Sequence, residues 1–215
     1  KAANVSEFWT RWHISLSRFL RNYLYIPLGG NRHGQFKRYR NLMLTMLLGG
    51  LWHGSNWTFV IWGGLHGLYL CVQHGWQTWR GEGRPAPTRA VRLFSQVLTF
   101  LAILVTWVFF RATDLGSALE VLRGLIGLNG LAVNPAIGPG ELAIVAVGAF
   151  IAFLMPNTNQ IVLYVGNRFP QALAAFCLIR PQWRPNLGWA LAMGILLVIG
   201  ILNMDKTADF IYAQF

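Results

Sequence analysis

Acidic residues are scarce in this chain. Its 215 residues hold 7 Asp or Glu against 18 Lys or Arg, and no carboxylate lies between Glu7 and Glu82. All 5 histidines fall within that carboxylate-free interval. Neutral imidazole, with an ordinary pKa of roughly 6.5, is suited to accepting a proton near neutral pH. We therefore expect any general base in this interval to be one of the histidines: His13, His33, His53, His66 or His74.

Cysteine is also scarce. The only two are Cys71 and Cys177, so far apart that they predict neither a disulfide framework nor a metal cluster. Ligands at zinc spacing, three to five residues apart with thiolates or a carboxylate, do not occur. A thiol nucleophile would need Cys71 beside His53, but 18 residues of helix would separate them by roughly 27 Å. We expect Cys71 to serve packing.

Charges of both signs together make up 12% of the residues, about half the usual share. The uncharged runs are correspondingly long. Residues 93–110 and 187–204 are each 18 residues without a formal charge, close to the roughly 20 needed to cross a bilayer. A third run, 142–155, ends at Pro156. The pattern predicts an all-α, polytopic transmembrane protein whose residues 1–215 form a single membrane domain.

The net charge of +11 does not indicate nucleic-acid binding. Its basic residues lie between the apolar segments, at 32–40, 80–92 and 180–184, rather than along one stripe. That distribution is typical of cytoplasmic loops. We expect no nucleic-acid partner, cytoplasmic basic loops, and the Gly- and Pro-rich 124–140 on the opposite side. The basic loops can also attract an anionic ligand, or their charge can reflect topology alone.

Residues 6–24 read as one amphipathic helix at the lipid headgroup boundary, with basic and aromatic residues on different faces. Ser6 is the expected N-cap. Pro27 and the Gly29-Gly30 pair are expected to end the helix.

A basic loop is expected over residues 31–41, and 42–79 form an apolar stretch interrupted by glycines. Because basic loops flank this stretch on both sides, it is expected to leave and re-enter the same face of the membrane as two short or re-entrant passes. Glycines at the breaks allow tight turns and close backbone approach.

Ionisable residues at membrane depth indicate function. His53 follows Trp52 and has glycines on both sides, which predicts a polar group in a shaped, low-dielectric pocket. His66 and His74 can be functional or can simply hydrogen-bond a neighbouring group. His33, in the basic loop, is expected to be solvated.

Four segments together resemble a known family. They are FWTRWHISLSRFLRNYLYIPLGGNR (8–32), MLLGGLWHGSNWTFVIWGGLHGLYL (46–70), WVFFRA (107–112) and DFIYAQF (209–215). The chain resembles the bacterial branch of the membrane-bound O-acyltransferases (MBOAT), which includes membrane proteins of alginate O-acetylation. The resemblance implies a shell of helices around a funnel. It also implies a C-terminal half, with further helices expected before Lys1.

The resemblance implies the chemistry as well. An acyl group, most simply acetyl, passes from a thioester such as acetyl-CoA to hydroxyls of an exported polysaccharide, directly or through a periplasmic acetyltransferase partner. No metal or prosthetic group takes part, and the setting is the lipid of a bacterial inner membrane. His53 matches the catalytic histidine, and His13 matches a second motif residue that orients or polarises a substrate. The candidates for binding substrate around these two histidines are Trp12, Trp52 and Asn56.

Two non-enzymatic alternatives stay open. A transporter or channel subunit would need polar residues recurring across several helices, whereas here they concentrate in residues 8–70. A haem protein could use His53 and His66 as axial ligands of two haems. Each haem would need a second histidine, and none lies in 93–110, 142–155 or 187–204.

Overall fold

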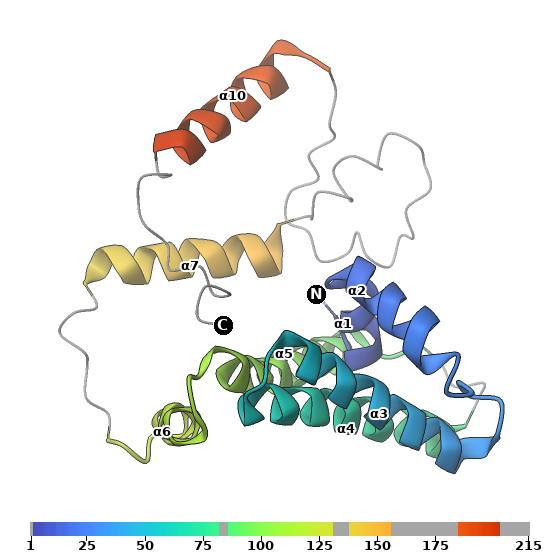
Figure 1. Cartoon of the computed structure of the whole chain (residues 1–215). Helices are drawn as coiled ribbons and strands as arrows, with labels where there is room; N and C mark the ends of the chain where they lie inside the picture. The colour runs from blue at the N-terminus through green and yellow to red at the C-terminus, as the bar shows by residue number, and fades with distance from the viewer. Residues whose placement is uncertain (1, 82–85, 131–137, 156–184, 203–215) are drawn as a thin grey trace. The chain divides into compact units, whose positions relative to one another are not determined.

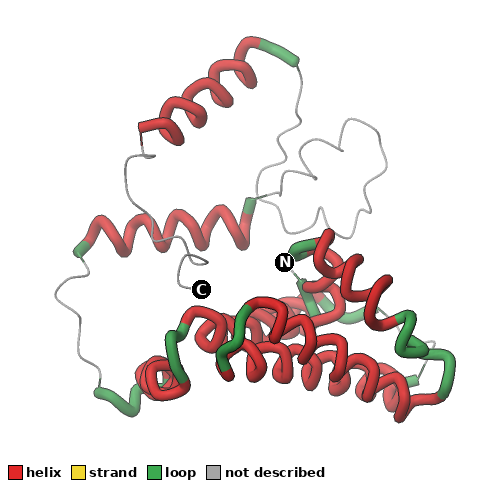
Figure 2. The backbone as a smooth tube through the Cα atoms, viewed as in Figure 1, coloured by secondary structure: helices red, strands yellow, loops and turns green. Residues whose placement is uncertain are grey.

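A computed structural model describes residues 2–81, 86–130, 138–155 and 185–202. Figure 2 shows helices joined by loops, and these described ranges contain no strand. The all-α prediction is therefore confirmed for them. The chain divides into two compact units, residues 1–132 with residue 215, and residues 133–214.

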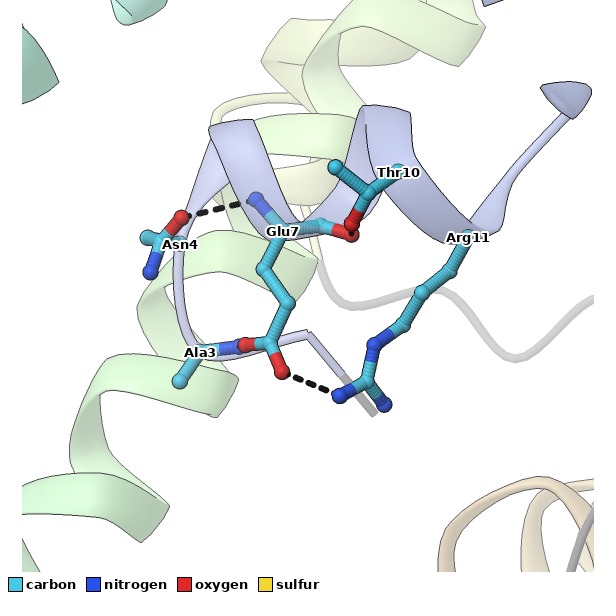
Figure 3. A network of polar contacts seen from close by, with 5 residues as sticks. All are labelled: Ala3, Asn4, Glu7, Thr10 and Arg11. Carbon is cyan, nitrogen blue, oxygen red and sulfur yellow. Dashed lines mark hydrogen bonds and ion pairs between the residues drawn. The ribbon is translucent and has the colours of Figure 1, made fainter. Parts of the chain in front are cut away.

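The first helix, α1 (Val5–Arg11), has its N-cap two residues earlier than predicted. Asn4, in extended conformation, is the N-cap, and its side chain accepts a hydrogen bond from the Glu7 backbone N–H at 2.8 Å. The Glu7 carboxylate reaches back to the Ala3 backbone N–H at 2.6 Å (Figure 3). The Asn4 side chain thus satisfies one of the N–H groups that the helix itself leaves open, and Glu7 ties down the residue before the cap. The prediction that Ser6 caps the helix is wrong, because Ser6 already lies inside the first turn.

The single helix predicted over 6–24 is also wrong. The chain breaks after α1 and resumes as α2 (Ile14–Phe19), which continues into a π-helical turn, η1 (Leu20–Tyr25). The cause of the break is His13, whose backbone is left-handed at φ 43 and ψ 55. A right-handed helix cannot pass through a residue in that conformation.

The turn after η1 lies where Pro27 and the glycines predicted it. Gly29 and Gly30 have φ values of 106 and 54, which glycine adopts without steric cost. The carbonyl of Gly30 accepts a hydrogen bond from the buried Asn41 side chain at 3.0 Å. This bond fastens the turn to the next helix.

Helices α3 (Gly34–His53) and α4 (Trp57–Arg80) form an antiparallel hairpin and lie side by side (Figure 1). The basic loop predicted over 31–41 is therefore too long, since residues 34–41 belong to α3. The two helices expected within 42–79 are present, joined by a turn at residues 54–56.

Glycines set the spacing of this hairpin, as the sequence predicted. A Cβ atom on Gly50 would lie 2.3 Å from the carbonyl oxygen of Phe59, and one on Gly63 would lie 2.3 Å from that of Met46. Both distances are far inside van der Waals contact. The backbones of α3 and α4 can therefore touch only because these positions carry no side chain.

Helix α5 (Arg89–Arg111) contains the predicted run 93–110 and packs on α4. Within the described residues it is the helix that is both long and apolar enough to cross a membrane. Helix α6 (Leu115–Leu125) follows and was not predicted. Asp114 caps it, and hydrogen bonds from the backbone N–H and hydroxyl of Ser117, with one from the Thr113 hydroxyl, lower the pKa of this exposed carboxyl.

The buried core of the first unit gathers side chains from α1, α2, η1, α3, α4, α5 and α6. It includes Trp9, Leu16, Leu20, Met46, Trp62, Phe109 and Ala118. The amphipathic N-terminal segment is thus held against the hairpin by its large apolar side chains.

The second unit contains two shorter apolar helices, α7 (Pro139–Leu154) and α10 (Leu187–Leu202). They correspond to the predicted runs 142–155 and 187–204. The described apolar side chains of both helices are largely exposed. Residues 203–204, Cys177, the basic 180–184 and the ending 209–215 lie outside the described residues. The single multi-pass membrane domain stays a prediction.

Candidate active site

His53 is the last residue of α3, and its side chain is 8% exposed. Aromatic rings surround the imidazole. The ring centroids of Trp52, Trp62 and Phe110 each lie 5.1 Å from that of His53, and the Phe59 ring lies at 6.3 Å. The rings come from the end of α3, the first turns of α4 and the end of α5. The structure therefore places the predicted catalytic histidine among aromatic rings that leave little of it exposed to solvent.

Asn56 holds this enclosure together. Its side-chain oxygen accepts the Thr58 backbone N–H at 3.1 Å and so caps α4, while its side-chain nitrogen donates to the Thr113 carbonyl at 2.7 Å. The second bond joins the turn after His53 to the segment that follows α5. Because α5 carries Phe110, Asn56 fixes Phe110 beside His53. Its amide oxygen and nitrogen each bond a backbone group, so Asn56 positions the turn after His53. Its role in binding substrate stays a prediction.

His13 occupies an exposed position at the start of α2. Its Nδ1 accepts the Leu16 backbone N–H at 3.3 Å and caps the helix. In the neutral ring, the proton must then lie on Nε2, which is left as a hydrogen-bond donor. His13 is also near enough to His53 for the charges of the two rings to interact. The two predicted catalytic histidines thus lie within electrostatic range of each other, and their catalytic roles stay predictions.

The two predicted tryptophans lie at different distances from His53. Trp52 touches the imidazole directly and is 67% exposed. Trp12 packs on Phe8 and meets the edge of Trp107 at 5.6 Å, and Trp107 in turn contacts Phe110 at 5.4 Å. Trp12 therefore reaches the site only through two other rings.

His66 has a packing role. It is 1% exposed, and its Nδ1 accepts a hydrogen bond from the Trp9 indole N–H at 3.3 Å. The rings of Phe8 and Trp62 lie at 6.0 and 4.7 Å. This contact fastens α1 to α4, which favours the structural interpretation of His66. Protein side chains also occupy the space around the His66 imidazole, which weighs against a haem there.

The remaining predicted residues lie away from His53. His74 pairs with Arg38 through a 2.7 Å contact between Nδ1 and the guanidinium, near the other end of the hairpin. Cys71 donates its thiol to the Tyr39 carbonyl at 3.6 Å, a packing contact as expected. His33 is exposed, as predicted.

Three residues at the site were not predicted: Phe59, Trp62 and Phe110. Trp62 contacts both His53 and His66, at 5.1 and 4.7 Å. Its position four residues before His66 puts it on the same face of α4, a signal visible in the sequence. Phe110 lies in WVFFRA, but the sequence does not indicate that this segment meets His53.

Fold and site together define a helical protein with an apolar span, in which a histidine lies enclosed by aromatic rings at the end of a glycine-packed hairpin. Residues 1–115, more than half of the chain, match MBOAT, the membrane-bound O-acyltransferase family. The chain belongs to this family, as its sequence motifs predicted.

Several curated relatives match the chain. The peptidoglycan O-acetyltransferase of Helicobacter pylori is 50% identical over 133 residues, 62% of this chain and 25% of that protein. The probable alginate O-acetylase AlgI of Pseudomonas aeruginosa is 53% identical over 126 residues, 59% of this chain and 23% of that protein. AlgI of Pseudomonas putida is 35% identical over 219 residues, 99% of this chain and 44% of that protein. The chain thus spans less than half the length of these relatives.

Proposed function

We propose that the protein is an O-acyltransferase of the bacterial inner membrane that moves an acyl group, most simply acetyl, from a thioester to a hydroxyl. The observation that carries the proposal is the position of His53. It is a buried imidazole, 8% exposed, with His13 nearby and no carboxylate between residues 7 and 82. The names of the relatives, O-acetylase and O-acetyltransferase, support the same chemistry.

His53 acts as the general base in this reaction. Its neutral ring accepts the proton of the acceptor hydroxyl while the hydroxyl oxygen attacks the thioester carbonyl carbon. The tetrahedral intermediate then collapses, the carbon–sulfur bond breaks, and the imidazolium returns the proton to the leaving thiolate. The products are the O-acyl ester and a free thiol, and the imidazole is neutral again. Such assistance is worth about 10²–10⁴-fold in rate.

His13 stabilises the developing oxyanion. Because Nδ1 accepts the Leu16 N–H, the Nε2–H group can donate to the carbonyl oxygen of the thioester. The aromatic side chains around His53 keep water from competing for the acyl group. Trp52, on the exposed side of His53, lies where substrates would pass.

Within the hairpin, His53 lies far from the basic residues near the start of α3. At 1.5 Å per residue, His53 lies roughly 28 Å along α3 from Gly34. In a multi-pass arrangement with that basic end in the cytoplasm, the site lies toward the outer side, within a funnel of helices. This suits an acceptor that is an exported polysaccharide, such as alginate or peptidoglycan, or a periplasmic acetyltransferase partner. The donor is a thioester such as acetyl-CoA, and no metal or prosthetic group is required.

The direct test is His53→Gln in the full-length protein. Gln has a similar size and can hydrogen-bond, but it cannot accept a proton at neutral pH. We expect acyl transfer to be abolished while folded protein remains in the membrane. The measurement is the amount of ester-linked acyl groups on surface polysaccharide, alongside the amount of membrane protein. His33→Gln, the same change at an exposed histidine, is the matched control and should keep wild-type activity.

Retention of more than about a tenth of the activity in His53→Gln would mean a barrier change below roughly 1.4 kcal/mol. His53 could not then be the principal base, and the proton would have to leave through another group. Absence of any difference in acyl esters between cells with and without the intact gene would refute the acyltransferase proposal itself.

A further inference from the structure

The buried His66 contacts side chains that lead to both of the proposed catalytic histidines. Its Nδ1 accepts the indole N–H of Trp9 at 3.3 Å. Its ring also lies 4.7 Å from that of Trp62, and the Trp62 ring lies 5.1 Å from that of His53. The indoles of Trp9 and Trp62 meet edge to face, with centroids 6.0 Å apart. His66, Trp9 and Trp62 are each less than 9% exposed, so they form one buried cluster.

Helix α1 connects this cluster to His13. Trp9 lies on α1, which has 7 residues, and a helix this short depends on tertiary contacts for its stability and position. The helical hydrogen bonding continues past Trp9, because the Trp12 backbone N–H bonds the Phe8 carbonyl at 2.8 Å. His13 follows directly, with its left-handed backbone. A shift or rotation of α1 therefore moves the start of the segment that carries His13.

The hydrogen bond between Trp9 and His66 restricts the position of α1 more strictly than the ring contacts do. Aromatic pairs are favourable over a range of centroid distances of about 4.5–7 Å, so ring contacts alone hold a helix loosely. A hydrogen bond weakens steeply once its donor and acceptor lose their alignment. Both partners here are buried, so a broken bond would leave a polar nitrogen unpaired away from water. The bond thus fixes both the rotation of α1 and its distance from α4.

We propose that His66 is a positioning residue for acyl transfer, which sets the placement of His13 relative to His53. It acts through Trp9 on α1 and through Trp62 beside His53. This inference rests on the proposed function, in which His53 takes the proton and His13 stabilises the oxyanion. A misplacement of about 1 Å, caused by a change away from the reacting atoms, can cost on the order of 10²-fold in rate.

The experiment compares two substitutions of nearly the same shape. Asn and Leu differ little in size, but only Asn carries an oxygen that can accept a hydrogen bond, as far along the side chain as Nδ1 of histidine. His66→Asn can therefore keep the bond from the Trp9 indole, and His66→Leu cannot. Trp9→Phe breaks the same bond from the donor side. The full-length variants are produced in cells that lack the wild-type gene. The rate at which ester-linked acyl groups appear on surface polysaccharide is divided by the amount of folded protein in the membrane.

We expect His66→Leu and Trp9→Phe each to lower ester formation per folded protein by about 10-fold or more, and His66→Asn to retain most of it. Leu70→Ala is the control for a loss of stability alone. Leu70 is a buried core residue one turn further along α4, and its truncation leaves a cavity. This control should lower the thermal stability in detergent, while each folded molecule stays as active as wild type.

The double variant Trp9→Phe with His66→Leu separates stability from positioning. It removes the donor and the acceptor together, so neither partner is left buried and unpaired. Its loss of stability should therefore be smaller than the sum of the losses in the two single variants. Because the bond that orients α1 is still missing, the double variant should stay as inactive as the single variants.

Equal activity of His66→Asn and His66→Leu per folded protein would overturn the positioning role. A double variant that regains activity together with stability would do the same. Both outcomes would leave the acyltransferase proposal standing, because the wild type would still form esters. If His66→Leu does not fold, Trp9→Phe tests the same bond with the imidazole in place, and wild-type activity in that variant would overturn the inference. No gene-dependent acyl ester in wild-type cells would instead refute the proposed function, and this inference with it.

Discussion

His13 is held in a left-handed backbone conformation that residues other than glycine rarely adopt, and it is the only such non-glycine residue in the described part of the chain. Non-glycine residues in this region cost of order 1–3 kcal/mol and persist where the surroundings enforce them, often at functional sites. Here the same residue ends one helix, caps the next through Nδ1 and keeps Nε2–H as a donor. A structural and a chemical role therefore coincide in one side chain.

Substitutions can separate these two roles. Asn and Asp both tolerate the left-handed region and cap helices well, but only Asn carries an N–H donor. We expect His13→Asn to keep part of the acyl transfer and His13→Asp to lose it, although both retain the cap. His13→Ala should lose activity and also about 1 kcal/mol of stability, the usual value of a cap. Ester formation and thermal unfolding in detergent measure the two effects.

Equal activity of the Asn and Asp variants would show that His13 serves only to cap α2. The oxyanion would then have to be stabilised by another donor.

The α3–α4 hairpin depends on the close approach of two backbones. Gly63 faces the carbonyl of Met46, where an added Cβ would lie at 2.3 Å. The neighbouring Gly64 faces only the end of the Leu47 side chain, at 3.6 Å, an ordinary contact distance. Adjacent glycines on one helix thus differ in what a methyl group would meet.

Gly63→Ala should destabilise the protein by about 1–3 kcal/mol, because the helices must separate to admit the methyl group. Gly64→Ala is the matched control. It should be neutral or stabilising by up to about 1 kcal/mol, since Ala favours the helix more than Gly does. Thermal unfolding of the detergent-solubilised proteins compares the two. A Gly63→Ala protein as stable as Gly64→Ala would mean that the two helices do not pack this closely.

At the largest scale, the connections between α3, α4 and α5 set which of their ends lie together. Because α3 and α4 are antiparallel, the start of α3 and the end of α4 lie at the same end of the hairpin. Helix α5 then runs for 23 residues toward the end where Thr113 meets Asn56. Basic residues at the first end predict that it faces the cytoplasm.

The background for this test is a protein in which Cys71 and Cys177 are replaced by Ala. Single cysteines introduced at Lys37 or Arg84 should not react with a membrane-impermeant thiol reagent applied to intact cells. A cysteine at Gly130 should react, because it lies in the segment predicted on the outer side. Lysed cells provide the control for reactivity at all three positions. Strong labelling at position 37 or 84 in intact cells would contradict the two-pass arrangement of α3 and α4.

Local patterns in the sequence were enough to predict the helical class, the apolar helices and the hairpin whose helices pack through glycines. An uncharged run of membrane length and glycines between two helical stretches act through neighbouring residues, so no knowledge of distant contacts was needed. The histidines and the motifs around them were likewise sufficient to identify the family, which the family match over residues 1–115 confirms.

Such local patterns did not predict the helix boundaries near the site. The break at His13 contradicts a continuous amphipathic pattern over residues 6–24, because the left-handed conformation of one residue has no periodic signature. Helix α3 begins at Gly34 within a basic segment that reads as a loop, since its packing against α4 compensates for its polar composition.

Composition and hydropathy are properties of the chain, so they were enough to predict a functional histidine in an apolar stretch with no carboxylate between Glu7 and Glu82. The surroundings of that histidine depended on the tertiary structure. The Asn56–Thr113 and Trp9–His66 hydrogen bonds each join residues 57 positions apart, and they bring Phe110 and Trp62 to their places around the site. Contacts at such separation depend on how whole helices pack, which no local pattern of residues encodes.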